Sequence, residues 1–108
     1  MDAELAIAHL DAGLERAKRR TTRVAAVERA GVQGVYVVAN ADLAGYAAGR
    51  FLPPDIIEIL PGTERVLEHE AQHLIAYRLG ARGACFECQD HGVDSRCPQG
   101  GYDLDCRR

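Results

Sequence analysis

Three residues near position 70 have the types and the spacing that a catalytic metal site needs. The segment His69-Glu70-Ala71-Gln72-His73 spells H-E-x-x-H within a stretch whose pattern is helical. Side chains four residues apart leave the same face of a helix, so both imidazoles could bind one metal ion. Glu70 lies beside them, where it could take a proton from a metal-bound water. The motif therefore predicts a hydrolytic zinc site.

The chemistry expected of such a site is the cleavage of a peptide bond. A catalytic zinc takes three protein ligands and keeps a fourth position for water, whose pKa falls from about 15.7 to about 7. Glu70 would accept the proton as this zinc-bound water attacks the peptide carbonyl, and would then pass it to the leaving amine. The alternative is a surface helix that carries two unrelated histidines.

All four cysteines lie in the segment 81–108, where glycines and a proline leave no helical or strand pattern. Such a segment needs something else to order it, and a second, structural zinc held by thiolates would serve. Two disulfides are the main alternative. In a third arrangement, one cysteine completes the zinc of His69 and His73, which would close that site and abolish catalysis. The candidate ligands are Cys85, Cys88, Cys97 and Cys106.

A few other side chains are weaker candidates for function. Tyr77 follows His73 by one helical turn and could polarise a substrate carbonyl, so we include it as a candidate catalytic residue. Tyr102 could do the same from the tail, although each tyrosine is more often a packing residue. Arg50 could bind substrate or face water. His9 reads as structural.

Composition limits the classes of function that the chain can have. With 108 residues, of which 47% are hydrophobic, the chain fits a single domain, 1–108, with one modest core. The net charge of −3 and the pI of about 5.8 give no general electrostatic reason for the chain to bind nucleic acid or an anionic membrane. We see neither a membrane-spanning run nor a signal peptide. We therefore expect a cytoplasmic protein. In that compartment clustered cysteines are interpreted first as metal ligands and only second as disulfides.

A long helix is expected at the N-terminus, with Asp2 as its N-cap. The 4-3-4-3 spacing of its apolar residues predicts one buried stripe, which consists of Ala3, Ile7, Leu10, Leu14 and Ala17. The helix could continue to about Ala30. It could also break at Thr21-Thr22, where either threonine could cap a second helix.

Three short strands and a second long helix are expected next. The strands are 35–39, the glycine-interrupted 45–52 and 56–60, the last being the most convincing. The helix should run from about Glu64 to Leu79, with Thr63 as N-cap and Gly80 after its end. One stripe of this helix would face the core, namely Leu67, Ala71, Leu74 and Ile75. An adjacent stripe would face a cleft, namely Val66, His69, Glu70, His73 and Tyr77.

The segment from Gly45 to Leu79 resembles the heart of the zincin-like peptidases, in their small gluzincin-like or minimal versions. That resemblance implies a short mixed sheet before the active-site helix, with 45–51 as an irregular edge strand lining the substrate cleft and 56–60 as an inner strand. It covers about a third of the chain. Only His69, Glu70 and His73 match the family pattern residue by residue.

The resemblance leaves the third zinc ligand open. The metzincin pattern is disfavoured, because Ala76 and Leu79 stand where that subfamily has glycine and histidine. SprT-like proteases bring a histidine, often followed by glycine, from downstream, and His91-Gly92 looks similar. Their cysteine module follows that histidine, whereas Cys85 and Cys88 precede it here. We take His91 as the third ligand, with Asp90, Asp94 or a cysteine as substitutes; His91 could equally be an exposed loop histidine.

The sequence thus predicts an α+β domain: a helix–sheet–helix core over 1–80 and a tail over 81–108 ordered by metal or by disulfides. Its predicted function is that of a zinc-dependent peptidase that acts on a peptide or protein substrate. A non-catalytic, zinc-stabilised protein that works within a larger assembly is the alternative. A SprT-like protease acting on DNA-associated proteins is a third possibility, against which the acidic balance argues.

Overall fold

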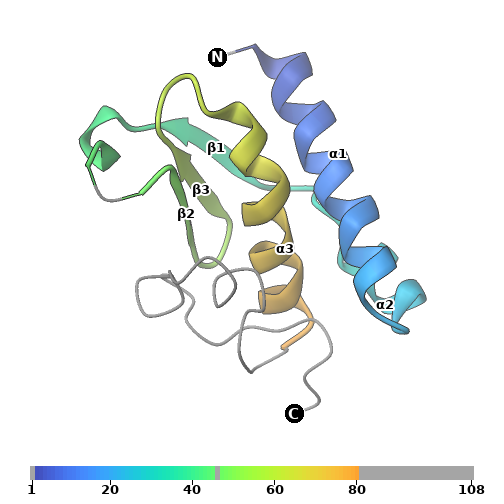
Figure 1. Ribbon diagram of the computed structural model, residues 1–108. Coiled ribbons are helices and arrows are strands. Elements are labelled where there is room, and N and C mark those ends of the chain that lie inside the picture. Colours follow the sequence, from blue (N-terminus) through green and yellow to red (C-terminus); the bar gives the residue numbers. More distant parts are fainter. Residues whose placement is uncertain (1, 46, 81–108) are drawn as a thin grey trace.

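The computed structural model describes residues 2–45 and 47–80, which form an α+β structure of helices around a small mixed sheet (Figure 1). This confirms the predicted fold class, while the cysteine-rich segment lies outside the described residues. Within them, no helix combines the length and apolar character that a bilayer span needs. The elements are α1 (Ala3–Arg20), α2 (Val24–Ala30), β1 (Tyr36–Ala39), the 3₁₀ turn η1 (Ala41–Leu43), β2 (Gly49–Leu52), β3 (Ile56–Ile59), the 3₁₀ turn η2 (Glu64–Val66) and α3 (Leu67–Arg78).

The first helix begins as predicted and ends at the threonine pair. Asp2 caps α1, since its carboxylate accepts a hydrogen bond from the Glu4 N–H at 2.9 Å. Thr21 is extended, with φ −139° and ψ 151°, and its hydroxyl accepts the Arg23 N–H at 3.1 Å. The break at Thr21-Thr22 is therefore what forms, and a continuous helix to Ala30 does not. Neither threonine caps the second helix, because the N-cap of α2 is Arg23.

The sheet has the order β1-β3-β2, with β1 parallel and β2 antiparallel to the central β3. Strands 1 and 3 form at the predicted places, whereas the second is shorter than the predicted 45–52. The register places Phe51 beside Ile57, and alternation places Ile59 on the same face. These three side chains are fully buried, so this face of the sheet supplies much of the core.

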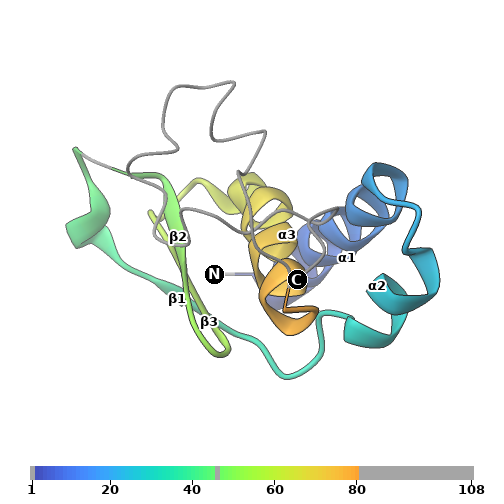
Figure 2. The same cartoon turned by 90° about the horizontal axis from the view of Figure 1, so that it is seen from below.

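The molecule is layered, with α3 between the sheet and α1 (Figures 1 and 2). The main core joins all three layers: Ala6 and Leu10 from α1, Phe51, Ile57 and Ile59 from the sheet, and Leu67, Ala71 and Leu74 from α3. A smaller cluster packs α2 against α1 and α3. It consists of Ala17, Val27, Ile75 and Ala76. The helix with the H-E-x-x-H motif is thus the central element of the fold.

The buried stripe of α1 differs from the one predicted. Its buried residues are Ala6, Leu10, Gly13 and Ala17, while Ala3 is exposed and Ile7 is 57% exposed. The reason is a close helix crossing: a Cβ on Gly13 would lie 2.6 Å from the Ala71 Cβ and 2.7 Å from the Glu68 carbonyl oxygen. Small residues allow this approach, so the stripe that packs is smaller and less hydrophobic than the one that periodicity favoured.

Candidate metal centre

The turn that leads into α3 fixes where the motif begins. Thr63 forms no side-chain cap on the helix, contrary to the prediction. Instead its hydroxyl donates to the Leu60 carbonyl at 2.6 Å and lies 3.2 Å from that of Ala48, which precedes β2. The 3₁₀ turn η2 follows and passes into α3. The other end matches the prediction, because Gly80 has φ +69° and donates its N–H to the Tyr77 carbonyl.

His69 and His73 converge, as their spacing predicts. Their Nε2 atoms are 2.9 Å apart. The ring centroids are 4.6 Å apart and the planes cross at 82°. His73 is buried, with 3% of its surface exposed, and His69 is half-buried.

Imidazole nitrogens are a donor type that zinc binds, and these two lie slightly closer together than zinc would hold them. Zinc bonds of about 2.0–2.1 Å at a tetrahedral angle would hold two ligand nitrogens roughly 3.3 Å apart. The observed Nε2–Nε2 distance of 2.9 Å would have to widen by a few tenths of an ångström to admit the ion. The same geometry also permits a hydrogen bond from one neutral ring to the other, according to the tautomer.

Glu70 lies between the helix and the edge strand. Its side chain is buried, with 4% of the residue exposed. A Cβ on Gly49 would lie 3.5 Å from the Glu70 Cγ and 2.9 Å from the Val66 Cγ1. Glycine at the start of β2 therefore lets this strand pass directly against the end of η2 and the Glu70 side chain.

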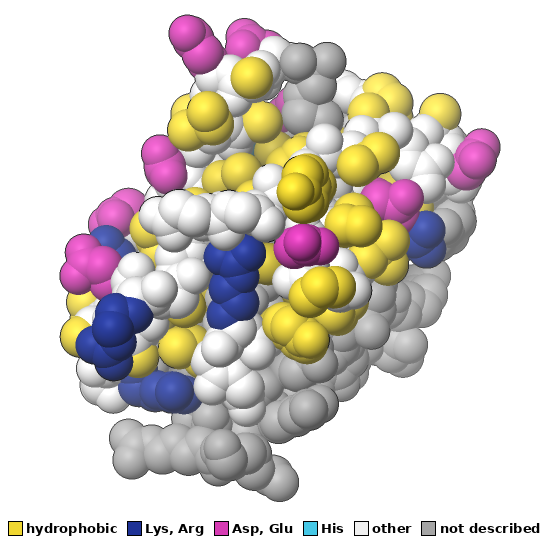
Figure 3. Space-filling view, turned by 180° about the vertical axis from the view of Figure 1, so that it is seen from behind, with side chains coloured by type: hydrophobic (Ala, Val, Ile, Leu, Met, Phe, Trp, Pro, Cys, Tyr) yellow, Lys and Arg dark blue, Asp and Glu magenta, His cyan; other side chains and the backbone are white. Residues whose placement is uncertain are grey.

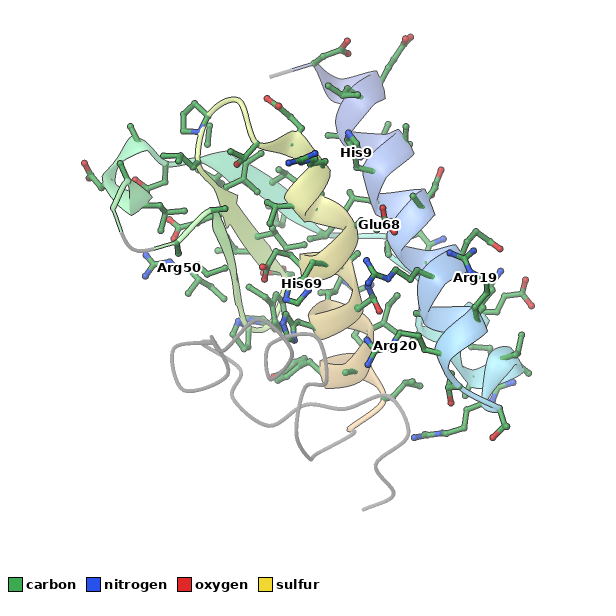
Figure 4. All side chains as sticks on the ribbon, viewed as in Figure 1. His9, Arg19, Arg20, Arg50, Glu68 and His69 are labelled. Atoms are coloured by element: carbon green, nitrogen blue, oxygen red, sulfur yellow. The ribbon has the colours of Figure 1, made fainter. Side chains whose placement is uncertain are left out.

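The opposite side of α3 is tied to α1. Figure 4 shows His69 on the side of α3 toward the sheet and Glu68 toward α1. Arg20 donates to the Gln72 Oε1 at 2.8 Å, and the Gln72 Nε2 donates to the Glu68 carbonyl at 3.2 Å. Arg16 pairs with the Glu68 carboxylate at 3.6 Å. The two middle residues of the motif, Ala71 and Gln72, therefore belong to the helix crossing and its polar border.

Two weaker candidates take part in packing or pairing. Tyr77 packs edge-on against the buried ring of Phe51, with centroids 5.6 Å apart. Arg50 forms an ion pair with Glu58 across the β2–β3 ladder. The predicted cleft-facing stripe thus has ends that pack on the core, since Val66 and Tyr77 both contact it.

The remaining predicted ligands cannot be placed beside this pair. Within residues 2–45 and 47–80, no group of three His, Cys, Asp or Glu side chains is positioned to hold a metal. The predicted third ligand and its substitutes lie outside this part of the chain, as do the predicted cysteine site and Tyr102. These residues are His91, Asp90, Asp94, Cys85, Cys88, Cys97 and Cys106.

Two contributors to the site were not recognised in the sequence. Gly49 read only as a residue that weakens a strand, although an isolated glycine in a strand can also mark a close backbone approach. Gln72 gave no signal, because its partner Arg20 is remote in sequence. Comparison of the chain with protein-family models, curated proteins and solved structures finds no match.

Proposed function

We propose that the chain is a zinc-dependent hydrolase of peptide bonds, in which His69 and His73 are zinc ligands and Glu70 is the general base. The observation that carries this proposal is the 2.9 Å approach of the two Nε2 atoms on one helix, with a buried carboxylate next to the first histidine in sequence. Two imidazoles that share a helix face and approach this closely can bind one metal ion with little rearrangement.

The protein side chains would divide the chemistry between them. When bound, zinc would activate a water and polarise the peptide carbonyl. Glu70 would take the proton of the attacking water and give it to the amine nitrogen as the C–N bond breaks. His69 and His73 would hold their ring orientation because α3 is packed between two layers. The predicted third ligand, His91, completes the proposed set.

A second candidate function also has an observation in its favour. All residues from Glu70 to Ala76 are buried, and His73 is only 3% exposed. A catalytic zinc needs an open position for water and substrate, whereas a structural zinc is closed. This burial favours a non-catalytic, zinc-stabilised protein that retains the same ligand pair.

Zinc content and cleavage, measured on the full chain and two variants, separate these functions. We expect at least one zinc per chain and cleavage of an unstructured protein such as unfolded casein. Glu70→Gln should keep the zinc and lose about 10²–10⁴-fold in rate, the usual contribution of a general base. Glu68→Gln is the matched control on the same turn, because Glu68 pairs with Arg16 on the other side of α3. This variant should keep both its zinc and its cleavage rate.

Each outcome of this experiment decides between the readings. A metal-free protein, or full activity of Glu70→Gln, would overturn the hydrolase proposal. Bound zinc with no cleavage of any unfolded substrate, accompanied by a loss of thermal stability on chelation, would instead support the structural role. In that case Glu70→Gln and Glu68→Gln should behave alike.

A further inference from the structure

The two outer strands of the sheet differ in how their edges are protected. In the described part of the chain, β1 and β2 each have one side without a partner strand, because β3 lies between them. Natural edge strands are commonly protected by charged side chains and proline. β2 carries Arg50, and Pro53-Pro54 follows it. The segment 35–39, Val-Tyr-Val-Val-Ala, has no charge and no proline.

Large apolar side chains are exposed at the β1 edge. Tyr36 is 66% exposed and Val38 is 45% exposed. The register aligns them with Ile56 and Glu58 of β3, on the face of the sheet turned away from α3. Figure 3 shows hydrophobic side chains exposed on the back of the molecule, with acidic and basic side chains among them. An exposed tyrosine and valine on an uncharged edge strand favour an interface.

We propose that β1 pairs antiparallel with β1 of a second copy of this chain, about a two-fold axis at Val37. The backbone supports this register. Tyr36 donates its N–H to Asp55 and Asn40 donates to Ile59, each at 2.8 Å, on the side of β3. Peptide groups alternate along a strand, so those of Val37 and Ala39 point to the open edge. Val37 would then exchange hydrogen bonds with its own counterpart.

The side chains are self-complementary in the same register. Pairing Val37 with itself puts Tyr36 opposite Val38 of the second copy, and the reverse pair follows by symmetry. Aromatic and β-branched residues are favourable cross-strand partners. Like charges do not meet, because the strand is neutral and the neighbouring Glu58 is bound by Arg50 and Asn40. One strand therefore satisfies both halves of a closed dimer.

The dimer should be weak. Stable interfaces commonly bury roughly 1,200–2,000 Å² in total, and a strand of this length supplies less by itself. The association should therefore be followed over a wide range, from about 5 to 500 µM protein.

Sedimentation velocity of the full chain, with and without chelator, tests the proposal. We expect the mass to rise with concentration and to level off at twice the monomer, whether or not zinc is present. Val38→Lys places a charge on the pairing strand, and Ala39→Pro removes an outward N–H while remaining compatible with an edge strand. Each should weaken association at least tenfold. Leu52→Lys, on the same face of β2, is the matched control and should leave it unchanged.

Circular dichroism identifies any variant that has not folded, and two different substitutions keep the test decisive if one fails. A chain that stays monomeric at the highest concentration would overturn the proposal. So would growth beyond the dimer, which would indicate an open-ended assembly, or dimers that survive both Val38→Lys and Ala39→Pro. Because zinc is not part of this interface, loss of the hydrolase proposal would leave this test unaffected.

Discussion

Gly49 is the residue whose identity the site constrains most directly. Its backbone φ does not lie in the left-handed region, so the fold does not need glycine there for conformational freedom. Space is the reason: a Cβ would lie 2.9 Å from the Val66 Cγ1 and 3.1 Å from the Glu58 carbonyl oxygen. The same approach puts β2 against the Glu70 side chain. A single methyl group thus tests whether the edge strand touches the proposed catalytic helix.

We expect Gly49→Ala to destabilise the protein by about 1–3 kcal/mol, the usual cost of inserting a methyl group into filled space. Urea unfolding with an unchanged m-value would measure it. If the chain cleaves peptide bonds, the cleavage rate should fall together with the stability, because Val66 and Glu70 must move to admit the methyl group.

Gly62→Ala is the control for this substitution. Gly62 has φ +86° and open space around its Cβ position, so the cost of a methyl group there is conformational and not steric. Equal or greater stability of Gly49→Ala relative to the parent chain would show that β2 does not pass this close to α3.

At the level of single residues, the part of the site that the sequence could predict is the part set by local spacing. His69 and His73 converge because positions four apart share a helix face, whatever surrounds the helix. Gly49 and Gln72 depend on which strand or helix lies next to them. That information is tertiary, so neither residue could be placed from the sequence.

The crossing of α1 and α3 is the main contact between elements, and Gly13 sits at its closest point. In an exposed helix, replacing glycine by alanine stabilises by about 1 kcal/mol. At Gly13 the new methyl group would meet the Ala71 Cβ at 2.6 Å and the Glu68 backbone oxygen at 2.7 Å. The sign of the effect should therefore reverse.

We expect Gly13→Ala to destabilise by about 1–3 kcal/mol, because the helices must separate to admit the methyl group. Denaturant unfolding gives the difference directly. The double variant Gly13→Ala/Ala71→Gly should recover part of the loss, since one of the two close contacts is removed and the contact with Glu68 remains. Additive effects of the two substitutions would contradict the crossing.

The elements themselves were largely predictable, with errors that share one physical origin. Helices, strands and the Gly80 stop follow local pattern and capping. The predicted stripe of α1 was right at Leu10 and Ala17 and wrong at Ala3 and Ile7, which are exposed. Periodicity ranks Ile7 above Gly13, whereas a close helix crossing selects small residues. The strand order could not be predicted either, because no local sequence pattern indicates that β3 lies between β1 and β2.

For the whole molecule, the proposed site joins two parts of the chain. The described helix supplies His69 and His73, and the proposed third ligand comes from 81–108. This makes zinc affinity a property of the full chain, and it predicts that a change beyond Gly80 weakens a site on α3. His91→Ala should lower zinc affinity more than about 100-fold, the upper end of what loss of an outer-shell partner costs.

Competition with a chromophoric chelator measures that affinity, with His9→Ala as the control because His9 lies on α1, away from the motif.

The four cysteines require a second measurement, since a separate thiolate zinc would hide the loss in the total metal content. Free-thiol titration distinguishes thiolates from disulfides, and cadmium substitution distinguishes sulfur from nitrogen ligation by its ultraviolet thiolate band. If His91→Ala binds zinc as tightly as the parent while a Cys→Ser variant does not, the third ligand is a thiolate. Sulfur ligation would then close the coordination sphere and favour the structural role over hydrolysis.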